Sequence, residues 1–180
     1  MSQTGSAQKA VDDTLQPTFT KAGPEAEHRW LLKLVGDWTY ETDLGPEHHG
    51  AKAAGTERGR SIGDLWVQLE GTGQMPGSSD PTTSVMTLGF DTVRRRFTGT
   101  FIASMMTHQW LYDGELDAAH DRLTLTSEGP SMSEQGKMAL YRDVVEFQGD
   151  DQRTLTALMQ QPDGTWQPFM TVSYRRARRG

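Results

Sequence analysis

The feature that most constrains this chain is a series of evenly spaced segments with the composition of β-strands. After Gly36, runs rich in Thr, Val, Leu and aromatic residues alternate with short turn signals. The clearest of these signals is Pro162-Asp163-Gly164, since Asp and Gly adopt the backbone angles that tight reversals need. We expect ten strands, over residues 36–44, 54–62, 65–73, 82–90, 95–103, 107–116, 121–128, 137–147, 153–160 and 165–175.

This spacing predicts an all-β fold, either an up-and-down barrel or a sandwich. An open sheet of ten strands would leave two exposed edges, so we favour closure into an antiparallel up-and-down β-barrel. Such a barrel is wider than its side chains readily fill, and we therefore expect an interior cavity. We divide the 180 residues into a flexible polar segment (1–22), one barrel domain (23–176) and a basic tail (177–180).

One short amphipathic helix is expected before the first strand. Gly23 and Pro24 fit an N-cap and a first helical residue, and Glu25 and Glu27 suit the positive end of the helix dipole. Apolar side chains then recur with helical period, at Trp30, Leu31, Leu34 and Val35. This apolar face has to dock on the rest of the chain, and we expect it to close one end of the barrel.

Loop length indicates which end is open, because successive loops of an up-and-down barrel alternate between its two ends. The longer loops are expected at one end, and the tight turns, with the helix, at the other. Long loops carry function more often than tight ones. The long-loop end also collects Met75, Met105, Met106 and Met132, whose adaptable side chains suit an apolar ligand. These methionines are equally compatible with ordinary packing under folded loops.

Composition excludes several classes of function. The net charge of −6 argues against a nucleic-acid partner, and the arginines at positions 175, 176, 178 and 179 are expected to form a solvated tail. No apolar run is long enough to cross a bilayer, so no membrane partner is expected. The absence of cysteine excludes thiolate metal sites and fits a cytoplasmic location. His48 and His49 are adjacent in a loop and preset no metal geometry, so no metal or cofactor is predicted.

The candidate ligand-binding residues lie on two of the expected strands and at the mouth. By the strand period of two, His108, Trp110 and Tyr112 share a face, where the imidazole could bind a ligand or act as a base. A structural histidine in the barrel wall is the alternative. Arg142 is a possible inward anchor for a carboxylate, although an outer ion pair with Glu146 fits as well. We add Met105, Met106, Trp66 and Tyr141 to the predicted ligand-binding set.

A set of motifs is spread over most of the chain. They lie at residues 27–31, 34–38, 65–67, 86–91, 99–106, 141–143, 169–170 and 174–176. Together they resemble a bacterial family known as domain of unknown function 1579. The resemblance covers nearly everything from Glu25 to Arg176, and it implies no established activity.

A short helix followed by Gly36-Asp37-Trp38 on the first strand is more distantly similar to the calycins, the lipocalin-like barrels. There a Gly-x-Trp on the first strand packs near an arginine of the last strand, which implies a cation–π contact of Trp38 with Arg175 or Arg176 at the barrel floor. Haem-binding nitrobindins are similar in layout, but their axial histidine lies near the final strands. Here no histidine follows His120, and haem is not expected.

Three hypotheses follow. The first is a binding protein that holds a small, largely apolar ligand inside the barrel, with a homodimer possible. The second is an enzyme of the same barrel type, such as an isomerase, lyase or hydrolase, with His108 as base beside Tyr112, Tyr141 or Asp143. The third is a structural or interaction domain whose barrel is packed shut. No established catalytic motif decides among them.

Overall fold

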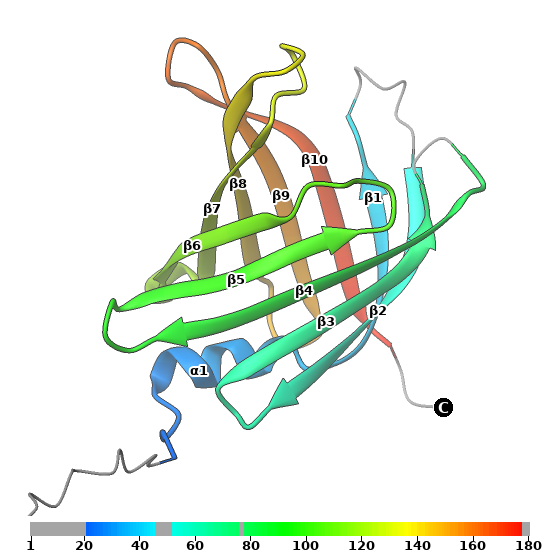
Figure 1. Cartoon of the computed structure of the whole chain (residues 1–180). Helices are drawn as coiled ribbons and strands as arrows, with labels where there is room; N and C mark the ends of the chain where they lie inside the picture. Colours follow the sequence, from blue (N-terminus) through cyan, green and yellow to red (C-terminus); the bar gives the residue numbers. More distant parts are fainter. Residues whose placement is uncertain (1–20, 46–51, 76–77, 178–180) are drawn as a thin grey trace, which may run out of the picture.

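The computed structural model describes residues 21–45, 52–75 and 78–177. Within these residues, ten antiparallel strands form a closed barrel in the order β1-β10-β9-β8-β7-β6-β5-β4-β3-β2 (Figure 1). The predicted up-and-down barrel is confirmed. The strands are β1 (Gly36–Asp43), β2 (Lys52–Ile62), β3 (Trp66–Gln74), β4 (Pro81–Asp91), β5 (Arg96–Ala103), β6 (Trp110–Asp117), β7 (Arg122–Pro130), β8 (Met138–Phe147), β9 (Gln152–Gln160) and β10 (Trp166–Arg176).

The barrel closes where the first strand pairs with the last. Trp38 of β1 lies opposite Arg176 of β10, and Tyr40 lies opposite Tyr174. Because these strands pair along most of their length, the sheet has no open edge there. Neighbouring strands are otherwise consecutive in sequence, which is why short turns suffice to join them.

The helix is shorter than the sequence predicted and begins later. Helix α1 covers Ala26–Leu31 and continues into the 3-10 turn η1 at Leu32–Leu34. The N-cap is Glu25, and the expected cap at Gly23 was wrong. Glu25 and His28 form a capping box, in which the Glu25 backbone N–H donates to His28 Nδ1 at 2.9 Å. This reciprocal pair provides hydrogen-bond acceptors for backbone N–H groups at the start of the helix. Gly23 has no side chain that could do so.

The helix lies across one end of the barrel, the end of the tight turns (Figure 1). Its Trp30 ring packs edge-on against Phe97 and Phe147 from the strands, with ring centroids 6.3 and 5.4 Å apart. Leu34 is fully buried, and its carbonyl comes so close to β2 that a Cβ on Gly59 would lie 2.3 Å from it. Glycine is therefore required at position 59, and the helix packs against the end of the barrel where it was expected.

Loops of the opposite end join β1 to β2, β3 to β4, β5 to β6, β7 to β8 and β9 to β10 (Figure 1). Met105, Met106 and Met132 lie in these loops and are exposed. His48 and His49 lie outside the described residues. No helix among residues 21–45, 52–75 and 78–177 has the length and apolar character that crossing a membrane requires.

Candidate functional site

The interior of the barrel contains a cavity of about 180 Å³. It extends from Leu34 at the helix-closed end to Gln74, Thr82 and Met105 at the long-loop end. Its apolar wall includes Leu69, Met86, Phe101, Leu155, Met170 and Val172. Its polar wall includes Tyr40, Glu57, Tyr112, Asp143, Arg153 and Tyr174. A mostly apolar enclosure with a few polar groups is the usual form of a small-molecule site.

One part of the polar wall is an ion pair between Glu57 and Arg153. Glu57 faces inward from β2, and Arg153, which is 2% exposed, comes from β9 and spans β10 and β1 to donate from Nη2 to Glu57 Oε1. Burial raises the pKa of Glu57, while the Arg153 guanidinium opposes that rise. The pair is thus a buried cation and anion that neutralise each other.

Aromatic rings enclose the same arginine. The Arg153 guanidinium lies 3.6 Å from the ring centroid of Tyr174 and 5.0 Å from that of Trp38. Burial and the nearby Glu57 raise the pKa of Tyr174, and the same two causes raise the pKa of Tyr40. Both phenols therefore keep their protons at neutral pH. Neither hydroxyl has a hydrogen-bond partner among the described residues, so both remain available as donors to a ligand.

The second polar pair is Asp143 with Tyr112. The Tyr112 hydroxyl on β6 donates to Asp143 Oδ2 on β8 at 2.5 Å. Burial raises the pKa of Asp143 to about 6, and the hydrogen bond from Tyr112 only partly offsets this effect. Asp143 retains accessible surface although it lies inside the barrel, because it borders the cavity. The cavity wall therefore holds a carboxyl group that titrates near neutral pH.

Two of the predicted ligand-binding residues line this cavity, Tyr112 and Met105. Three others lie together towards the long-loop end: the aromatic rings of Trp110 and Tyr141, and the side chain of Met106 beside them. The Trp110 and Tyr141 rings meet edge-on with centroids 4.9 Å apart, and Trp110 Nε1 donates to Met106 Sδ at 3.1 Å. Tyr141 donates to the Pro130 carbonyl oxygen at 2.6 Å.

His108 does not lie on strand β6, contrary to prediction. The strand begins at Trp110, and His108 lies in the preceding loop, where its Nε2 is 3.1 Å from the Glu128 carbonyl oxygen. Its ring packs edge-on against Trp110 at 5.0 Å. Together with Met105, Met106 and Pro130 it lines a shallow surface pocket outside the cavity. His108 thus fits the alternative of a structural histidine, because its partner is a backbone carbonyl group of the barrel wall.

Arg142 and Trp66 face away from the cavity. On β8 the side chains of Tyr141, Asp143, Val145 and Phe147 point inward with period two, so Arg142 points outward, where it lies 4.0 Å from the Trp166 ring centroid. The expected partner, Glu146, pairs with Arg122 instead, at 2.7 Å. Trp66 is 41% exposed and lies over Gly89 on the outer wall.

The floor residues differ from one another in role. Trp38 is fully buried and donates from Nε1 to the Leu34 carbonyl oxygen at 3.0 Å. Of the two arginines expected beside its ring, Arg176 lies 4.2 Å from the centroid, while Arg175 is exposed on the other face of β10. The Arg153 guanidinium is a second cation near the Trp38 ring, at 5.0 Å. Arg176 also donates to the carbonyl oxygens of Val35 and Lys33 and so ties the last strand to the end of the helix.

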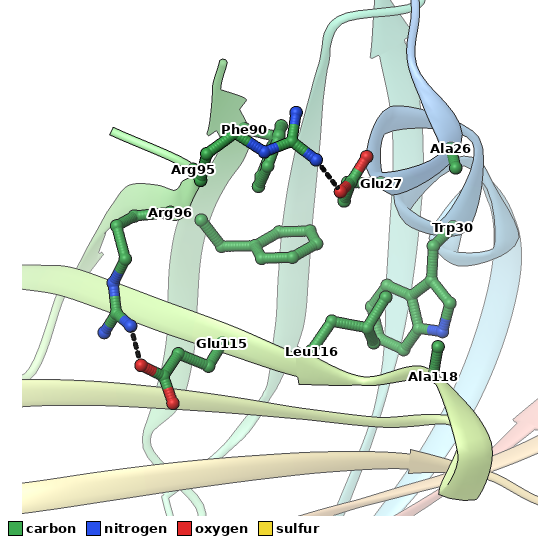
Figure 2. Close-up of a pocket in the computed structure, with 10 residues that line it drawn as sticks. Ala26, Glu27, Trp30, Phe90, Arg95, Arg96, Glu115, Leu116 and Ala118 are labelled. Carbon is green, nitrogen blue, oxygen red and sulfur yellow. Dashed lines mark hydrogen bonds and ion pairs between the residues drawn. The ribbon is translucent and has the colours of Figure 1, made fainter. Parts of the chain in front are cut away.

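A second, larger hollow lies outside the barrel, between helix α1 and strands β4 to β6 (Figure 2). It measures about 560 Å³ and is lined by Trp30, Phe90, Phe97 and Leu116. Its charged side chains are already paired, Arg95 with Glu27 and Arg96 with Glu115. The groove is open to solvent, and these pairs leave no buried polar group waiting for a ligand.

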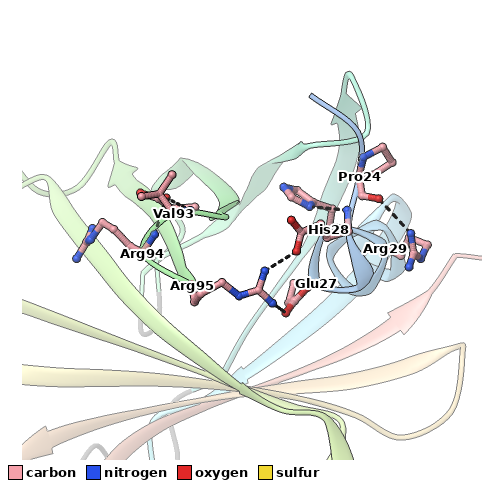
Figure 3. Close-up of polar contacts among 9 residues, drawn as sticks. Pro24, Glu27, His28, Arg29, Val93, Arg94 and Arg95 are labelled. Atoms are coloured by element: carbon pink, nitrogen blue, oxygen red, sulfur yellow. Dashed lines mark hydrogen bonds and ion pairs between the residues drawn. The ribbon is translucent and has the colours of Figure 1, made fainter. Parts of the chain in front are cut away.

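The rim of this groove holds the helix on the barrel. Arg95, at the β4–β5 turn, pairs with both Glu25 and Glu27 at the start of α1 (Figure 3). The turn itself is held by Asp91 Oδ1, which accepts the backbone N–H groups of Val93 and Arg94 at 2.9 and 3.0 Å. The Arg95 pairs thus attach the helix, while the Arg96–Glu115 pair joins β5 to β6. We therefore take the interior cavity as the candidate site.

Sequence reasoning missed the importance of Glu57, Arg153 and Tyr174. A signal for Arg153 existed, because Leu155 and Ala157 follow it on the same apolar face of β9. Asp143 likewise shares its face with Val145 and Phe147. Glu57 gave a weaker signal, since its inward neighbours, Gly55 and Gly59, do not mark an apolar face.

Comparisons with known proteins support the fold. A model of a protein family of unknown function, DUF1579, matches residues 23–176. No curated protein sequence matches the chain. Rv2717c from M. tuberculosis is similar in structure, with a TM-score of 0.55 and 11% identity over 87% of this chain and 100% of that chain. The S-type phycobiliprotein lyase CPES from Guillardia theta gives a TM-score of 0.51 at 11% identity, over 86% of this chain and 93% of that one.

Proposed function

The chain belongs to the DUF1579 family of proteins of unknown function, and we propose that it binds a small, largely apolar molecule inside its barrel. The observation that carries this proposal is the interior cavity of about 180 Å³, in which an apolar wall meets a few polar groups. Barrels of this size class hold one small ligand in other proteins.

The volume limits the size of the ligand. An apolar protein cavity of about 150 Å³ accommodates a benzene molecule. A cavity of about 180 Å³ therefore fits a molecule with one ring or a short aliphatic chain. The adaptable side chains of Met86, Met105 and Met170 line it and would adjust to the shape of the bound molecule.

The cavity also argues against a barrel that is packed shut. Protein interiors are normally filled so closely that few voids exceed the size of a water molecule. Here the void borders two carboxyl groups and three tyrosine side chains, which are costly to bury unless they have partners. A binding role explains both the space and the polar groups.

An enzyme of the same barrel type is the second candidate, and a specific observation favours it. The carboxyl group of Asp143 has its pKa raised to about 6 by burial, which is close to the value that suits a general base at neutral pH. The Tyr112 hydroxyl donates to Oδ2 and so orients the carboxyl group, which leaves Oδ1 to accept a proton. In this mechanism Asp143, and not His108, is the proton acceptor, because His108 lies outside the cavity.

The proposal is tested by native mass spectrometry of protein purified from its own host. We expect a retained small molecule, seen as an added mass that denaturation removes. Ser84→Phe should abolish it, because Ser84 of β4 lines the cavity and a phenyl ring there fills the space. Thr83→Phe is the matched control, since Thr83 is exposed on the outer face of the same strand.

Loss of the added mass in Ser84→Phe but not in Thr83→Phe supports binding inside the barrel. Retention of the same mass by Ser84→Phe would place the ligand elsewhere and contradict the proposal. For the enzyme, the decisive sign is a change in the mass of the released molecule during incubation, which Asp143→Asn should stop.

A further inference from the structure

We propose that the molecule bound in the barrel is a small organic amine, held as its ammonium cation by the Asp143 carboxylate and the rings of the surrounding tyrosines. This inference deepens the proposed function and rests on it. It follows from the position of Asp143, from the charge balance of the cavity and from the aromatic groups around it.

Asp143 is a cavity-facing carboxylate with an incomplete set of partners. Its one hydrogen bond among the described residues comes from the Tyr112 hydroxyl, to Oδ2, at 2.5 Å. A buried carboxylate normally has a cation or several hydrogen-bond donors beside it, because burial without them is costly. Asp143 Oδ1 has no such partner in the described part of the chain, and the residue borders the cavity. A ligand N–H group would supply the missing donor.

The charge balance of the cavity points to a cation. Its walls carry two carboxyl groups, Glu57 and Asp143, and a single cation among the described lining residues, Arg153. Arg153 is committed to Glu57 and enclosed by the rings of Tyr174 and Trp38. When Asp143 is ionised, the cavity therefore has one uncompensated negative charge. An ammonium ion neutralises it, whereas an anionic ligand would add a second uncompensated negative charge.

One observation could suggest an anion instead. Arg153 Nε is buried and has no hydrogen-bond partner among the described residues. This atom is shielded by the protein, with aromatic rings on the guanidinium, so a molecule in the cavity does not reach it. Asp143, in contrast, has accessible surface in the cavity.

The surrounding side chains suit an organic ammonium better than a hydrated metal ion. Tyr40, Tyr112 and Tyr174 line the cavity, and the faces of aromatic rings attract organic cations. Leu69, Leu155 and Val172 provide apolar surface for the carbon skeleton. Among the described residues, no group of three His, Asp or Glu side chains is placed to hold a metal ion.

Binding should depend on the ionisation of Asp143. The titratable and charged groups of the cavity are Tyr112 on β6, Tyr174 on β10, Tyr40 on β1, and the Glu57–Arg153 pair. Its direct neighbours on β7 and β9, Leu125 and Ala157, carry no charge. With a pKa of about 6, Asp143 is ionised at pH 7.5 and mostly protonated at pH 5, so affinity for an amine should fall about tenfold between them.

The experiment compares three molecules of nearly equal size, benzylamine, benzyl alcohol and benzoate, by isothermal titration calorimetry on the full chain. At pH 7.5 we expect benzylamine to bind at least about tenfold more tightly than benzyl alcohol, and benzoate to bind most weakly. Asp143→Asn should reduce benzylamine affinity about tenfold and leave benzyl alcohol within about threefold. Asp150→Asn, in an exposed turn, is the matched control and should change neither.

The outcomes separate this inference from the proposed function. Equal binding of benzylamine and benzyl alcohol, unchanged in Asp143→Asn, overturns the amine inference but supports an apolar cavity. Tighter binding of benzoate also overturns it. Failure of all three molecules to bind contradicts both proposals. If Asp143→Asn does not fold, the fall in benzylamine affinity from pH 7.5 to pH 5 in the wild-type chain decides the question, with benzyl alcohol as the reference.

Discussion

Asp143 and Arg153 are both enclosed by the barrel, yet their charges are compensated differently. Arg153 has Glu57 as a counterion and aromatic rings on its faces. Asp143 has one neutral donor, Tyr112, and burial raises its pKa to about 6. The first arrangement is complete within the protein, while the second leaves a site that a ligand can complete.

The raised pKa of Asp143 makes folding stability depend on pH. The folded chain holds this proton more tightly than the unfolded chain, where the ordinary value is 3.8. The contribution of the protonated Asp143 carboxyl group to the free energy of unfolding is therefore fully present below about pH 4. It is lost as the pH rises through about 6. Asp143→Asn removes this dependence, and its stability relative to wild type should increase by roughly 2–3 kcal/mol from pH 4 to pH 7. Urea unfolding at both pH values measures the difference, and an unchanged difference would contradict it.

The Glu57–Arg153 pair predicts a strong coupling between two substitutions. Arg153→Met leaves Glu57 buried without a counterion and should lower the free energy of unfolding by about 3–5 kcal/mol. The double variant Glu57→Gln, Arg153→Met removes both charges and should recover much of that loss. Chemical denaturation of wild type, Glu57→Gln, Arg153→Met and the double variant gives a double-mutant cycle that measures this coupling. Simple additivity of the two losses would show that the ion pair does not form inside the barrel.

At the scale of elements, the helix is held on the barrel mainly by apolar packing. Trp30 is buried between Phe97 and Phe147 and also donates from Nε1 to Asp121 Oδ1, whereas the Arg95 contacts with Glu25 and Glu27 lie on the surface. Trp30→Ala should lower the free energy of unfolding by about 3–5 kcal/mol. Arg95→Ala should cost far less, because solvent screens surface ion pairs. Thermal unfolding of both variants tests this order, and an equal loss would mean that the ion pairs hold the helix.

The strands were predictable because apolar and polar residues largely alternate along them, and because residues suited to turns follow most of them. Asp163 shows this well, since its Oδ1 accepts the Thr165 backbone N–H at 2.9 Å and so fixes the last hairpin. The start of the helix was not predictable from Gly23 and Pro24, because a reciprocal bond between Glu25 and His28 sets it. His108 was misplaced because strand β6 begins at Trp110, three residues after the start at residue 107 that the composition suggested.

The site was less predictable than the fold, for a physical reason. Alternation along β8 shows that Tyr141 and Asp143 oppose Arg142, but it does not show which side is inside. The apolar character of Val145 and Phe147 decides in favour of Asp143. The contact of Glu57 with Arg153 joins residues far apart in the sequence across β10 and β1, and only closure of the barrel brings them together.

At the scale of the whole molecule, the closed sheet and the helix leave one accessible end. The floor of Trp30, Leu34 and Trp38 seals the other end, and the cavity lies between this floor and the long loops. The outer groove beside the helix is larger, at about 560 Å³, but its charges already bind one another. These features of the whole structure support the proposal that a small ligand binds in the interior.

The most direct test of this account is a crystal structure of the wild-type protein with benzylamine. We expect the ring inside the barrel, among Leu69, Leu155 and Val172, with its nitrogen within hydrogen-bond distance of Asp143. A ring inside the barrel with its nitrogen elsewhere would contradict the amine inference alone. A ring in the groove beside helix α1, or a barrel that stays empty at saturating benzylamine, would contradict the central claim that the interior is the binding site.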